Sequence, residues 1–541
     1  MPKITLNGVE IEARDRATIM QVADDLGTRL PRYCYHPRLS IAGCCRICLV
    51  EVEGRPRMEP SCRTEVAENM VIHTHSSKAV QARKAQLEFL LLHHPIDCPI
   101  CDQAGECGLQ NYYMEIGRHK SRFKLEQKTK RCKAYPIGPH VVYDAERCIL
   151  CMRCIRFCAE VAKDPELGIN ERGDRSEIVT FPGEPLDNPY SLNTVHVCPV
   201  GALTSRDSRF KQRVWFLKKP VPSICPGCAN GCNNYIRSGR PPYVNLRDYW
   251  VIHRLNPRDN DEVNQAWLCD EGWLSYHFVN EERLLQPHVR EGEELVPVSW
   301  EEALSLVAKK INEILANHGS SALGGISSSH CANEAHYLFH KLMKEVIGTE
   351  NLDLIKGRIG YEDDFLIRAD KSPNSQGALD MGIHPGTEGL NASQMLAAGG
   401  GLKGLYIMGG RADLAEVFES EQLKEALSQM ELVVLQVSNL TEACRYAHVL
   451  LPGATFAEVE GTFTNYASRV QRFKPVFDPR GESLPDWAIL KNIAVALEAL
   501  WPYECAEDVL QEAAAVISKY NGLTYPTIGD MGVNLGVKAS E

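Results

Sequence analysis

The sequence predicts a multidomain α/β protein, with small cysteine-rich domains in its first half and one larger domain in its second half. Its 541 residues suffice for about three or four domains of ordinary size. Eighteen of the 21 cysteines lie between Cys34 and Cys269, in groups with short spacings. After Cys269, short apolar segments alternate with amphipathic helical patterns, which is typical of a doubly wound parallel sheet.

Composition and charge limit the classes of function. Hydrophobic residues make up 44% and charged residues 24% of the chain, as in ordinary globular proteins. The formal net charge of −11 argues against a nucleic-acid partner held by general charge attraction. No apolar run reaches about 18 residues, and the start lacks the basic-then-apolar pattern of a signal peptide. We therefore expect reduced cysteines that are free to bind metals, and membrane contact only through partners.

Residues 1–78 begin with the pattern of a β-hairpin followed by a helix. Apolar residues alternate on both sides of Asn7-Gly8, a dipeptide that favours a tight two-residue turn. A helical period then runs through residues 19–26 and stops at Gly27, as is common at the end of a helix. This order of elements predicts a small β-grasp domain.

The same segment carries the first cysteine group, with the spacing C-x10-C-x2-C-x13-C: Cys34, Cys45, Cys48 and Cys62. A 2Fe-2S cluster needs four thiolates with backbone N–H donors nearby, and Gly43 lets the backbone come close to the central pair. We therefore predict a ferredoxin-type 2Fe-2S domain. Zinc is the alternative, although a ten-residue gap is long for a zinc knuckle. Cys44 adjoins a ligand and is left unassigned, with packing as its expected role.

Residues 78–117 combine a helix with a second group of metal-binding side chains. A helical period runs from Lys78 to His94, which places His94 on the buried side, and Pro95 ends it. The group has the spacing H-x3-C-x2-C-x5-C: His94, Cys98, Cys101 and Cys107. One imidazole and three thiolates can hold a 4Fe-4S cluster, which is the prediction, or zinc, which is the alternative. His93 is a weaker candidate because its spacing and its helix face are both wrong.

Residues 137–217 contain a run with the spacing C-x2-C-x2-C-x3-C, like that of bacterial ferredoxins. In two-cluster ferredoxins the last cysteine of such a run serves the other cluster. The mirror-image second run is missing here, but the distal pair Cys198-Pro199 is present. The predicted ligands of one 4Fe-4S cluster are therefore Cys148, Cys151, Cys154 and Cys198. We expect Cys158 to be a buried thiol, with a ligand role as the alternative, and Cys132 to be structural.

Residues 218–274 carry a fourth cysteine group, C-x2-C-x3-C followed by a distant cysteine: Cys225, Cys228, Cys232 and Cys269. This group resembles the N-terminal module of molybdopterin oxidoreductases, which implies a 4Fe-4S cluster. The gap before Cys269 is longer than in that module and is rich in Arg, Pro, Asn and Asp, so we interpret it as a surface insertion. A zinc ribbon is the alternative.

Residues 275–541 resemble the molybdopterin oxidoreductase fold. A capping box at Ser299-Trp-Glu-Glu302 precedes a helical stripe of apolar residues. Residues 405–408 and 432–435 are predicted to be short buried strands of a doubly wound sheet. Gly409-Gly410 follows the first of these strands and is interpreted as a plain strand-to-helix turn, because the fuller glycine fingerprint of a nucleotide site is absent.

Two features of active molybdopterin enzymes are missing from this half. In the formate enzymes, a cysteine or selenocysteine beside a histidine follows a G-T-x-N-x-D segment, but no such pair follows Gly348-Thr-Glu-Asn-Leu-Asp353. The chain also ends before the domain that would clamp a second pterin. We therefore expect a degenerate, truncated domain that acts as a docking scaffold without molybdopterin.

The order of the four sites resembles one family closely, the large iron–sulfur subunit of respiratory NADH–quinone oxidoreductase (complex I), known in bacteria as its G subunit. The resemblance covers residues 1–275 strongly and the rest loosely. It implies one 2Fe-2S and three 4Fe-4S clusters that carry single electrons from a flavin-bearing, NADH-oxidising subunit to quinone-side iron–sulfur subunits, while the complex translocates protons. It also implies a peripheral location on the cytoplasmic face of the inner membrane, and no catalytic residue in this chain.

Other classes of protein share parts of this pattern. The molybdenum or tungsten subunit of NAD-linked formate dehydrogenase is the main alternative, and a zinc scaffold without redox activity is another. Iron-only hydrogenases share the early modules, but their second ferredoxin cluster and their catalytic cysteines have no counterpart here. Metal analysis distinguishes the two alternatives, because a formate dehydrogenase subunit binds molybdenum or tungsten and a scaffold without redox activity binds zinc.

Overall fold

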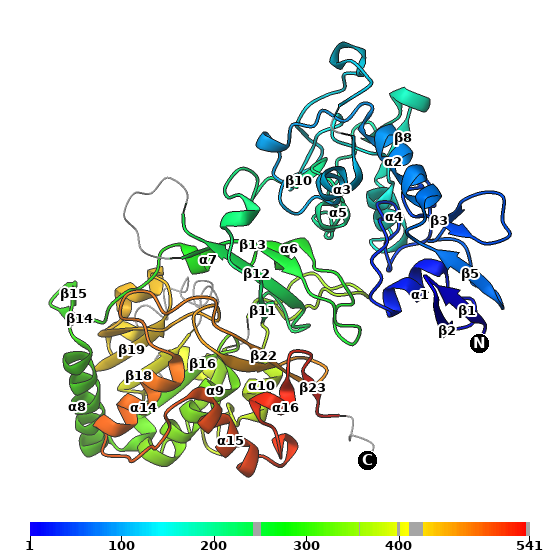
Figure 1. The fold of residues 1–541 in the computed structure, drawn as a ribbon. Helices are drawn as coiled ribbons and strands as arrows, with labels where there is room; N and C mark the ends of the chain where they lie inside the picture. Colours follow the sequence, from blue (N-terminus) through cyan, green and yellow to red (C-terminus); the bar gives the residue numbers. More distant parts are fainter. Residues whose placement is uncertain (119, 242–249, 356, 398–400, 410–425, 537–541) are drawn as a thin grey trace. The chain divides into compact units, whose positions relative to one another are not determined.

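The structure is a computed structural model that describes residues 1–118, 120–241, 250–355, 357–397, 401–409 and 426–536. The chain divides into two compact units, Met1–Leu217 and Lys218–Glu541 (Figure 1). Within the described ranges, every helix is too short or too polar to cross a lipid bilayer.

The first domain of unit 1 is a five-stranded mixed sheet with one helix. The strand order is β2-β1-β5-β3-β4, with β1 parallel to β5. In the β1–β2 hairpin, Asn7 and Gly8 both adopt positive φ angles, 52° and 86°, as the predicted turn requires. The predicted hairpin and helix are confirmed. The elements are β1 (Lys3–Leu6), β2 (Val9–Glu12), α1 (Ile19–Asp25), β3 (Leu49–Val52), β4 (Glu59–Pro60) and β5 (Met70–His73).

The rest of unit 1 consists of short helices and small sheets around the second and third cysteine groups. Two small sheets contain β10-β7-β6 and β8-β9. The elements are α2 (Ser77–Leu91), α3 (Gly108–Ile116), β6 (Tyr135–Pro136), β7 (Val141–Tyr143), α4 (Arg153–Glu160), β8 (Leu167–Asn170), β9 (Glu177–Thr180), α5 (Asn193–Val197) and β10 (Leu203–Ser205). Short 3₁₀ turns connect them at Cys98–Ile100, Leu125–Gln127, Gly173–Arg175 and Val214–Phe216.

The helix predicted to reach His94 ends earlier, at Leu91. Pro95 has no N–H to bond the carbonyl of Leu91, so the last predicted turn cannot close. The ring of Pro95 also disfavours a helical conformation at His94. His94 therefore belongs to the loop that leads into the second cysteine group, and not to the helix.

Unit 2 begins with a three-stranded antiparallel sheet, β11-β12-β13. The interpretation of the segment between Cys232 and Cys269 as a surface insertion is wrong for its described part. Ile236, Ile252 and Leu255 of β12 and β13 are buried, and they pack in one core with Phe463 and Phe473. The polar residues of this segment resemble a loop in sequence, although they alternate with buried apolar ones. The elements are β11 (Val221–Ile224), β12 (Asn233–Gly239), β13 (Val251–Pro257), α6 (Asp270–Leu274) and α7 (His277–Asn280).

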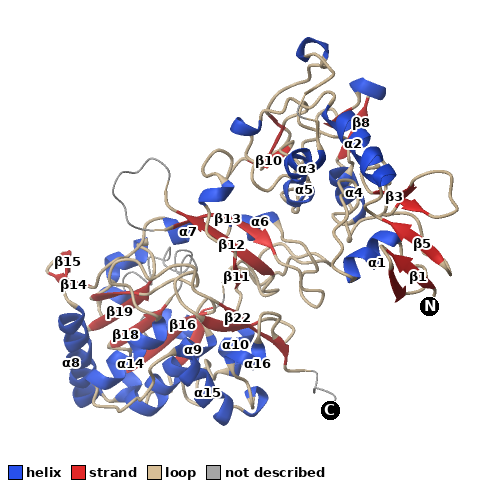
Figure 2. Cartoon of the chain, in the orientation of Figure 1, coloured by secondary structure: helices blue, strands red, loops and turns tan. Residues whose placement is uncertain are grey.

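The main sheet of unit 2 has seven strands in the order β15-β14-β20-β19-β18-β16-β17, of which β20, β19, β18, β16 and β17 are parallel (Figure 2). Alternate residues of its strands enter two separate cores: Tyr406 and Met408 enter one, Leu405 and Ile407 the other. A sheet buried on both faces is the predicted doubly wound arrangement. The strands are β14 (His288–Glu291), β15 (Glu294–Pro297), β16 (Leu323–Ser328), β17 (Leu352–Ile355), β18 (Gly404–Met408), β19 (Leu432–Val437) and β20 (Val449–Pro452).

The helices of unit 2 include the long one predicted behind a capping box. Ser299 and Glu302 cap α8 reciprocally, as predicted. The predicted turn at Gly409-Gly410 lies partly outside the described residues, which end at Gly409. The remaining elements are α8 (Trp300–His318), α9 (Asn333–Lys341), a π-helical turn (Leu342–Ile347), α10 (Ser375–Asp380), α11 (Ala392–Leu396), β21 (Gly461–Thr464), β22 (Arg469–Phe473), α14 (Asp486–Ala496), α15 (Ala506–Val516), α16 (Tyr525–Ile528) and β23 (Val533–Asn534). Short 3₁₀ turns occur at Ser320–Ala322, Glu442–Tyr446 and Ser518–Tyr520.

A buried carboxyl group ties three of these elements together. Glu334 on α9 is 1% exposed and accepts hydrogen bonds from the backbone N–H and the hydroxyl of Thr462 on β21, both at 3.0 Å. The hydroxyl of Tyr525 on α16 donates to it at 3.1 Å. Burial raises the pKa of Glu334 to about 7 even though these donors favour its charged form.

We predict that the core around Glu334 loses stability as the pH rises toward 7. Between the ordinary pKa of a glutamate and about 7, the folded state retains a proton that the unfolded state releases, so rising pH favours unfolding. Hydrogen–deuterium exchange of residues 461–464, corrected for intrinsic rates, should accelerate over this range in the native protein and change much less in Glu334→Gln. The same pH slope in both proteins would contradict the prediction.

Candidate iron–sulfur cluster sites

The four predicted ligands of the first site converge inside the β-grasp domain. All four are buried: Cys34 and Cys62 are 1% exposed, Cys48 2% and Cys45 7%. The backbone N–H of Cys34 donates to Sγ of Cys45 at 3.4 Å, and Cys62 contacts both Cys34 and Cys48. Hydrogen bonds among these thiols lower the pKa of Cys34 and raise the pKa of Cys45 and Cys62, so they favour the thiolate form at Cys34 alone among these three.

Cys44, which the sequence leaves unassigned, makes a contact between two sites. It is exposed, and its Sγ lies 3.9 Å from the carbonyl oxygen of Leu150 and 3.8 Å from that of Cys151. Both carbonyls belong to the ligand loop of the third site. Cys44 therefore contributes to the contact between the first and third sites, which local sequence could not reveal because the contact spans more than 100 positions.

The second set of predicted ligands lines a single cavity: His94, Cys98, Cys101 and Cys107. Nδ1 of His94 is buried and has no hydrogen-bond partner in the described part of the chain. Burial lowers the pKa of His94 to about 4, so its imidazole is neutral at pH 7, as a metal ligand must be. A buried, unpartnered ring nitrogen beside three thiols fits a metal cluster.

Ion pairs fix the turn that carries Cys98 and Cys101. Asp97 accepts from Nη2 of Arg147 at 2.6 Å and from Nζ of Lys133 at 3.0 Å. Burial alone would raise the pKa of Asp97, but these two cations outweigh it and lower the pKa to about 2. Arg213 donates to the carbonyl of Cys98 at 3.1 Å. The ligand loop is therefore held by charges on distant parts of unit 1.

His93 is engaged elsewhere, in agreement with its weaker candidacy. Its Nδ1 accepts a hydrogen bond from the backbone N–H of Thr129 at 3.0 Å, and its ring meets Phe123 edge-on at 5.9 Å. It is not among the residues that line the second cavity.

The third set of predicted ligands lines a separate cavity: Cys148, Cys151, Cys154 and Cys198. Leu150 and Met152, between the first three, adopt positive φ angles of 51° and 58°, which are uncommon for non-glycine residues. The N–H of Leu150 lies 3.4 Å from Sγ of Cys148. This loop therefore turns backbone donors toward sulfur, as cluster binding requires.

Burial also keeps the thiols of the third site neutral unless a cation is bound. It raises the pKa of Cys151 to about 12 and that of Cys198 to about 11. Bound iron would supply the positive charge that deprotonates them.

The two other cysteines near the third set differ in burial. Cys158 is fully buried and outside the cavity lining, as expected. Cys132, which we expect to be structural, is exposed.

One segment, Cys198–Gly201, joins the second and third sites. The carbonyl oxygen of Pro199 lies 3.7 Å from Sγ of Cys107. Gly201 lines the second cavity, and a Cβ at this position would lie 2.2 Å from Sγ of Cys101. Only a glycine lets the two ligand loops approach this closely, because any other residue would overlap the sulfur.

Side chains from the third site and from the second module also reach the first site. Arg153 donates to the carbonyl of Tyr35 and Arg156 to that of Cys34, both at 2.5 Å. Tyr33 is fully buried, and its hydroxyl lies 3.5 Å from the carbonyl of Gly108 at the start of α3. The three sites of unit 1 are therefore parts of one packed body.

The fourth set of predicted ligands lies in the first part of unit 2. Its members are all buried: Cys225, Cys228, Cys232 and Cys269. Cys225 and Cys232 pair through a backbone hydrogen bond of 2.8 Å at the end of the β11–β12 hairpin. A Cβ on Gly272 would lie 3.3 Å from Sγ of Cys225 and 3.5 Å from Sγ of Cys269, so the structure brings the distant cysteine to the others.

Several groups that support the fourth set were not predicted from sequence. Asn230 donates to Sγ of Cys232 at 3.0 Å. Lys371 is 8% exposed, pairs with Glu271 at 3.2 Å, and places its positive charge where it favours the thiolate of Cys228. Gln471 donates to the carbonyl of Gly231 at 2.9 Å from 240 residues away. No local pattern marks Lys371, because only the tertiary fold brings it to the site.

Among the described residues, no three His, Cys, Asp or Glu side chains converge closely enough to surround a single metal ion.

Four regions of the chain match known sequence families. Residues 2–77 match a 2Fe-2S iron–sulfur cluster binding domain, and residues 83–122 match the NADH-ubiquinone oxidoreductase-G iron–sulfur binding region. Residues 138–204 match the ferredoxin-like domain of NADH-quinone oxidoreductase subunit 3. Residues 283–365 and 368–496 match molybdopterin oxidoreductase. The predicted fold class is confirmed: 2Fe-2S and 4Fe-4S binding domains precede a molybdopterin oxidoreductase-type domain.

Several similar proteins are G subunits of NADH-quinone oxidoreductase. The G subunit of NADH-quinone oxidoreductase from Rickettsia conorii is 38% identical over 351 residues, 65% of this chain and 50% of the relative. The chain is a homologue of this iron–sulfur subunit. The G subunit from Streptomyces coelicolor is 38% identical over 370 residues, 67% of this chain and 42% of the relative. The NADH-ubiquinone oxidoreductase 75 kDa subunit of Reclinomonas americana is 38% identical over 346 residues, 64% of this chain and 48% of the relative.

The chain spans about half the length of the curated relatives it matches. Among solved structures, a chain of NAD+-reducing [NiFe]-hydrogenase in the H2-reduced state is 28% identical with a TM-score of 0.36, covering 39% of this chain and 91% of that chain.

We predict that Gly201→Ala disturbs the second site although it removes no ligand. The added methyl group would overlap Sγ of Cys101, so this ligand has to move. Electron paramagnetic resonance of the reduced chain should show a lost or altered second-site signal, with a loss of up to about four irons per chain. Gly168→Ala is the matched control, because a Cβ there meets nothing within 4 Å. Unchanged spectra in both variants would contradict the prediction.

Proposed function

We propose that this chain is the electron-relay subunit of an NADH:quinone oxidoreductase and that it carries one 2Fe-2S and three 4Fe-4S clusters. The observation that carries the proposal is the pair of cavities in unit 1, each lined by a complete set of predicted ligands and joined by residues 198–201. The homology to the G subunits of such enzymes supports the same function. The domain boundaries proposed from sequence are 1–78, 78–117, 137–217, 218–274 and 275–541.

The proposed ligand sets assign a role to sixteen side chains. The first set binds 2Fe-2S through Cys34, Cys45, Cys48 and Cys62, and the second binds 4Fe-4S through His94, Cys98, Cys101 and Cys107. The third and fourth bind 4Fe-4S through Cys148, Cys151, Cys154 and Cys198, and through Cys225, Cys228, Cys232 and Cys269. When bound, the clusters supply one-electron chemistry, which the protein positions. The chain itself holds the ligands, excludes water by burial and supplies compensating charge through Arg147 and Lys371.

The second half is proposed to be a docking scaffold and not a second redox enzyme. The segment Gly348–Asp353, which precedes the catalytic pair in formate enzymes, runs directly into β17. Neither a cysteine nor a histidine follows it in residues 354–361. We therefore expect no molybdopterin in this chain and no catalytic residue of its own. Its enzymatic role is that of a subunit in the complex.

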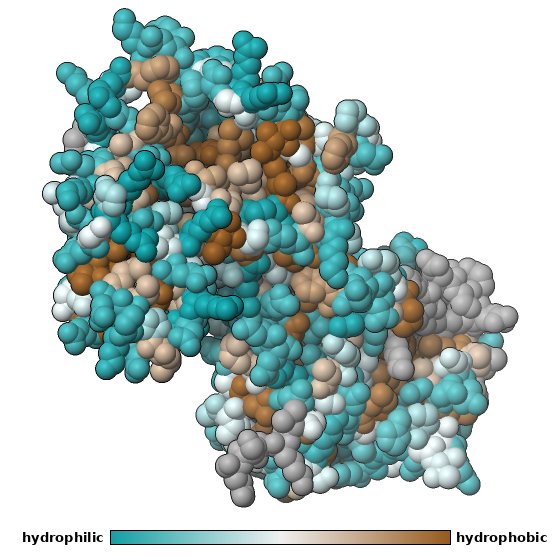
Figure 3. All heavy atoms as spheres, turned by 90° about the vertical axis from the view of Figure 1, so that its right-hand side faces the viewer, coloured by the Kyte–Doolittle hydropathy of each residue, from teal (hydrophilic) through white to brown (hydrophobic). Residues whose placement is uncertain are grey.

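The partners are proposed to be other subunits of the complex: a flavin-bearing, NADH-oxidising subunit and quinone-side iron–sulfur subunits. Large apolar side chains are exposed around the second site: Phe89 (64%), Ile100 (63%), Met114 (74%), Trp215 (55%) and Phe216 (62%). Figure 3 shows apolar side chains gathered in patches on one face. Patches of this kind mark protein contacts. Membrane contact would then go through partners, at the cytoplasmic face of the inner membrane.

Anaerobic purification with metal and sulfide analysis tests the proposed function. One 2Fe-2S and three 4Fe-4S clusters predict about 14 iron and 14 sulfide per chain, with negligible molybdenum, tungsten and zinc. Molybdenum or tungsten with a pterin would support a formate dehydrogenase instead. Zinc without sulfide would support a scaffold that has no redox activity.

We predict that His94→Cys keeps the second cluster and lowers its reduction potential, whereas His94→Ala loses about four irons per chain. A thiolate adds a negative charge where the imidazole is neutral, which favours the oxidised cluster. A redox titration followed by electron paramagnetic resonance measures the shift. His93→Ala is the matched control, because His93 lies outside the cavity lining. Loss of the same signal in His93→Ala, or no change in His94→Ala, would refute the assignment.

A further inference from the structure

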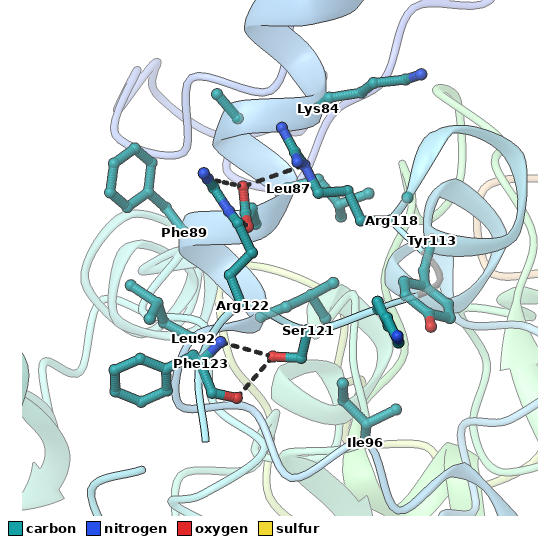
Figure 4. A pocket seen from close by; sticks show the side chains of 15 residues that line it. Lys84, Leu87, Phe89, Leu92, Ile96, Tyr113, Arg118, Ser121, Arg122 and Phe123 are labelled. Atoms are coloured by element: carbon teal, nitrogen blue, oxygen red, sulfur yellow. Dashed lines mark hydrogen bonds and ion pairs between the residues drawn. The ribbon is translucent and has the colours of Figure 1, made fainter. Parts of the chain in front are cut away.

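A pocket of about 460 Å³ lies beside the second site, between helix α2 and residues 117, 118 and 120–123 (Figure 4). Its volume falls within the range of roughly 300–1,000 Å³ that is usual for small-molecule sites. None of the predicted ligand sets assigns a function to its lining residues. The predicted cluster ligands are absent from its lining, so the pocket is distinct from the second cavity.

The pocket combines an apolar interior with a cationic rim. Its buried and half-buried apolar side chains are Leu87, Leu91, Leu92 and Phe123, and the exposed Phe89 and Ile96 complete its apolar lining. Its charged side chains are Lys84, Arg118, Lys120 and Arg122, against one carboxylate, Glu88. Among the lining residues that the structure describes, four cations and one anion leave a net charge of +3.

Glu88 neutralises only part of this charge. Arg122 binds the Glu88 carboxylate through two nitrogens at 2.7 and 2.6 Å, and a nitrogen of Arg118 lies 3.5 Å from it. Lys84 and Lys120 are exposed and make no ion pair with any described residue. The two lysines therefore remain available to a bound anion.

The pocket shares a wall with the second cavity. Leu91, Ile96 and Tyr113 line both spaces. A molecule in the pocket would therefore lie one side chain away from the cavity of His94 and the three cysteines. Its presence would change the packing around that site.

We propose that this pocket binds a small amphiphilic anion, an apolar body that carries one carboxylate, sulfonate or phosphate group. The apolar body fills the space along Leu87, Leu91 and Leu92, while the anionic group pairs with Lys84 and Lys120. A neutral analogue would gain only the apolar contact, and a cationic one would be repelled by the rim.

The first test is a fluorescence titration of the purified, cluster-loaded chain with 8-anilinonaphthalene-1-sulfonate, followed by competition. We expect decanoate to displace the dye, 1-decanol to compete at least about tenfold more weakly, and decyltrimethylammonium not to compete. Equal competition by decanoate and decanol would overturn the proposal, because the cationic rim would then have no part in binding.

Variants locate the site. Charge reversal in the double variant Lys84→Glu/Lys120→Glu should weaken decanoate competition about tenfold, and Ala85→Trp, which fills the pocket from an exposed lining position, should abolish it. Lys3→Glu, a charge reversal on the exposed Lys3 of β1 outside the pocket, is the matched control and should bind as the native chain does. Binding that is equal in all of these proteins would overturn the assignment.

A second readout does not depend on dye fluorescence. Decanoate should alter the line shape of the second-site paramagnetic signal in the native chain and leave it unchanged in Ala85→Trp. Decanoate binding that persists in the isolated chain but disappears in the assembled complex would show that a partner's segment fills the pocket, and would also overturn the proposal. Neither result bears on the metal content that tests the proposed function.

Discussion

A thiolate can be buried only beside compensating positive charge, and this constraint governs the first half of the molecule. Burial raises the pKa of Cys101 and Cys107 in the second set and of the cysteines in the third and fourth sets, which makes these free thiols neutral. Bound iron would reverse this by stabilising thiolates, while backbone N–H groups and buried cations share the remaining charge. The neutral imidazole of His94 needs less compensation than a fourth thiolate would. The small domains of unit 1 surround the predicted ligands and shield them from water.

The contacts within unit 1 show how a chain of short elements becomes one packed body, as the proposed electron relay requires. The ion pair of Asp97 with Arg147 crosses 50 positions, and the bond from Arg156 to Cys34 crosses 122. The shortest link is the segment Cys198–Gly201, which supplies a ligand to one set and lies against two ligands of another. Because electron transfer falls steeply with distance, the proposed relay depends on how closely this four-residue segment holds the second and third sites together.

Sequence predicted what depends on local spacing and missed what depends on tertiary contact. The hairpin at Asn7-Gly8 and the capped helix α8 are confirmed, because turn geometry and capping involve residues only a few positions apart. The sequence predicts that α2 reaches His94, but the helix ends at Leu91, because Pro95 has no N–H to bond the carbonyl of Leu91. The ligand sets are grouped in the structure as their spacing predicts, but the roles of Gly201 and Lys371 were invisible, since both act through space on distant sulfurs.

The proximity of the second and third sites is the central claim, and the spin relaxation of the reduced chain tests it most directly. Two paramagnetic clusters joined by residues 198–201 should relax each other. The second-site signal should therefore relax faster in the native chain than in Cys154→Ala, which removes a ligand of the third site and leaves the second intact. The same relaxation rate in both proteins, with second-site iron retained, would contradict the account.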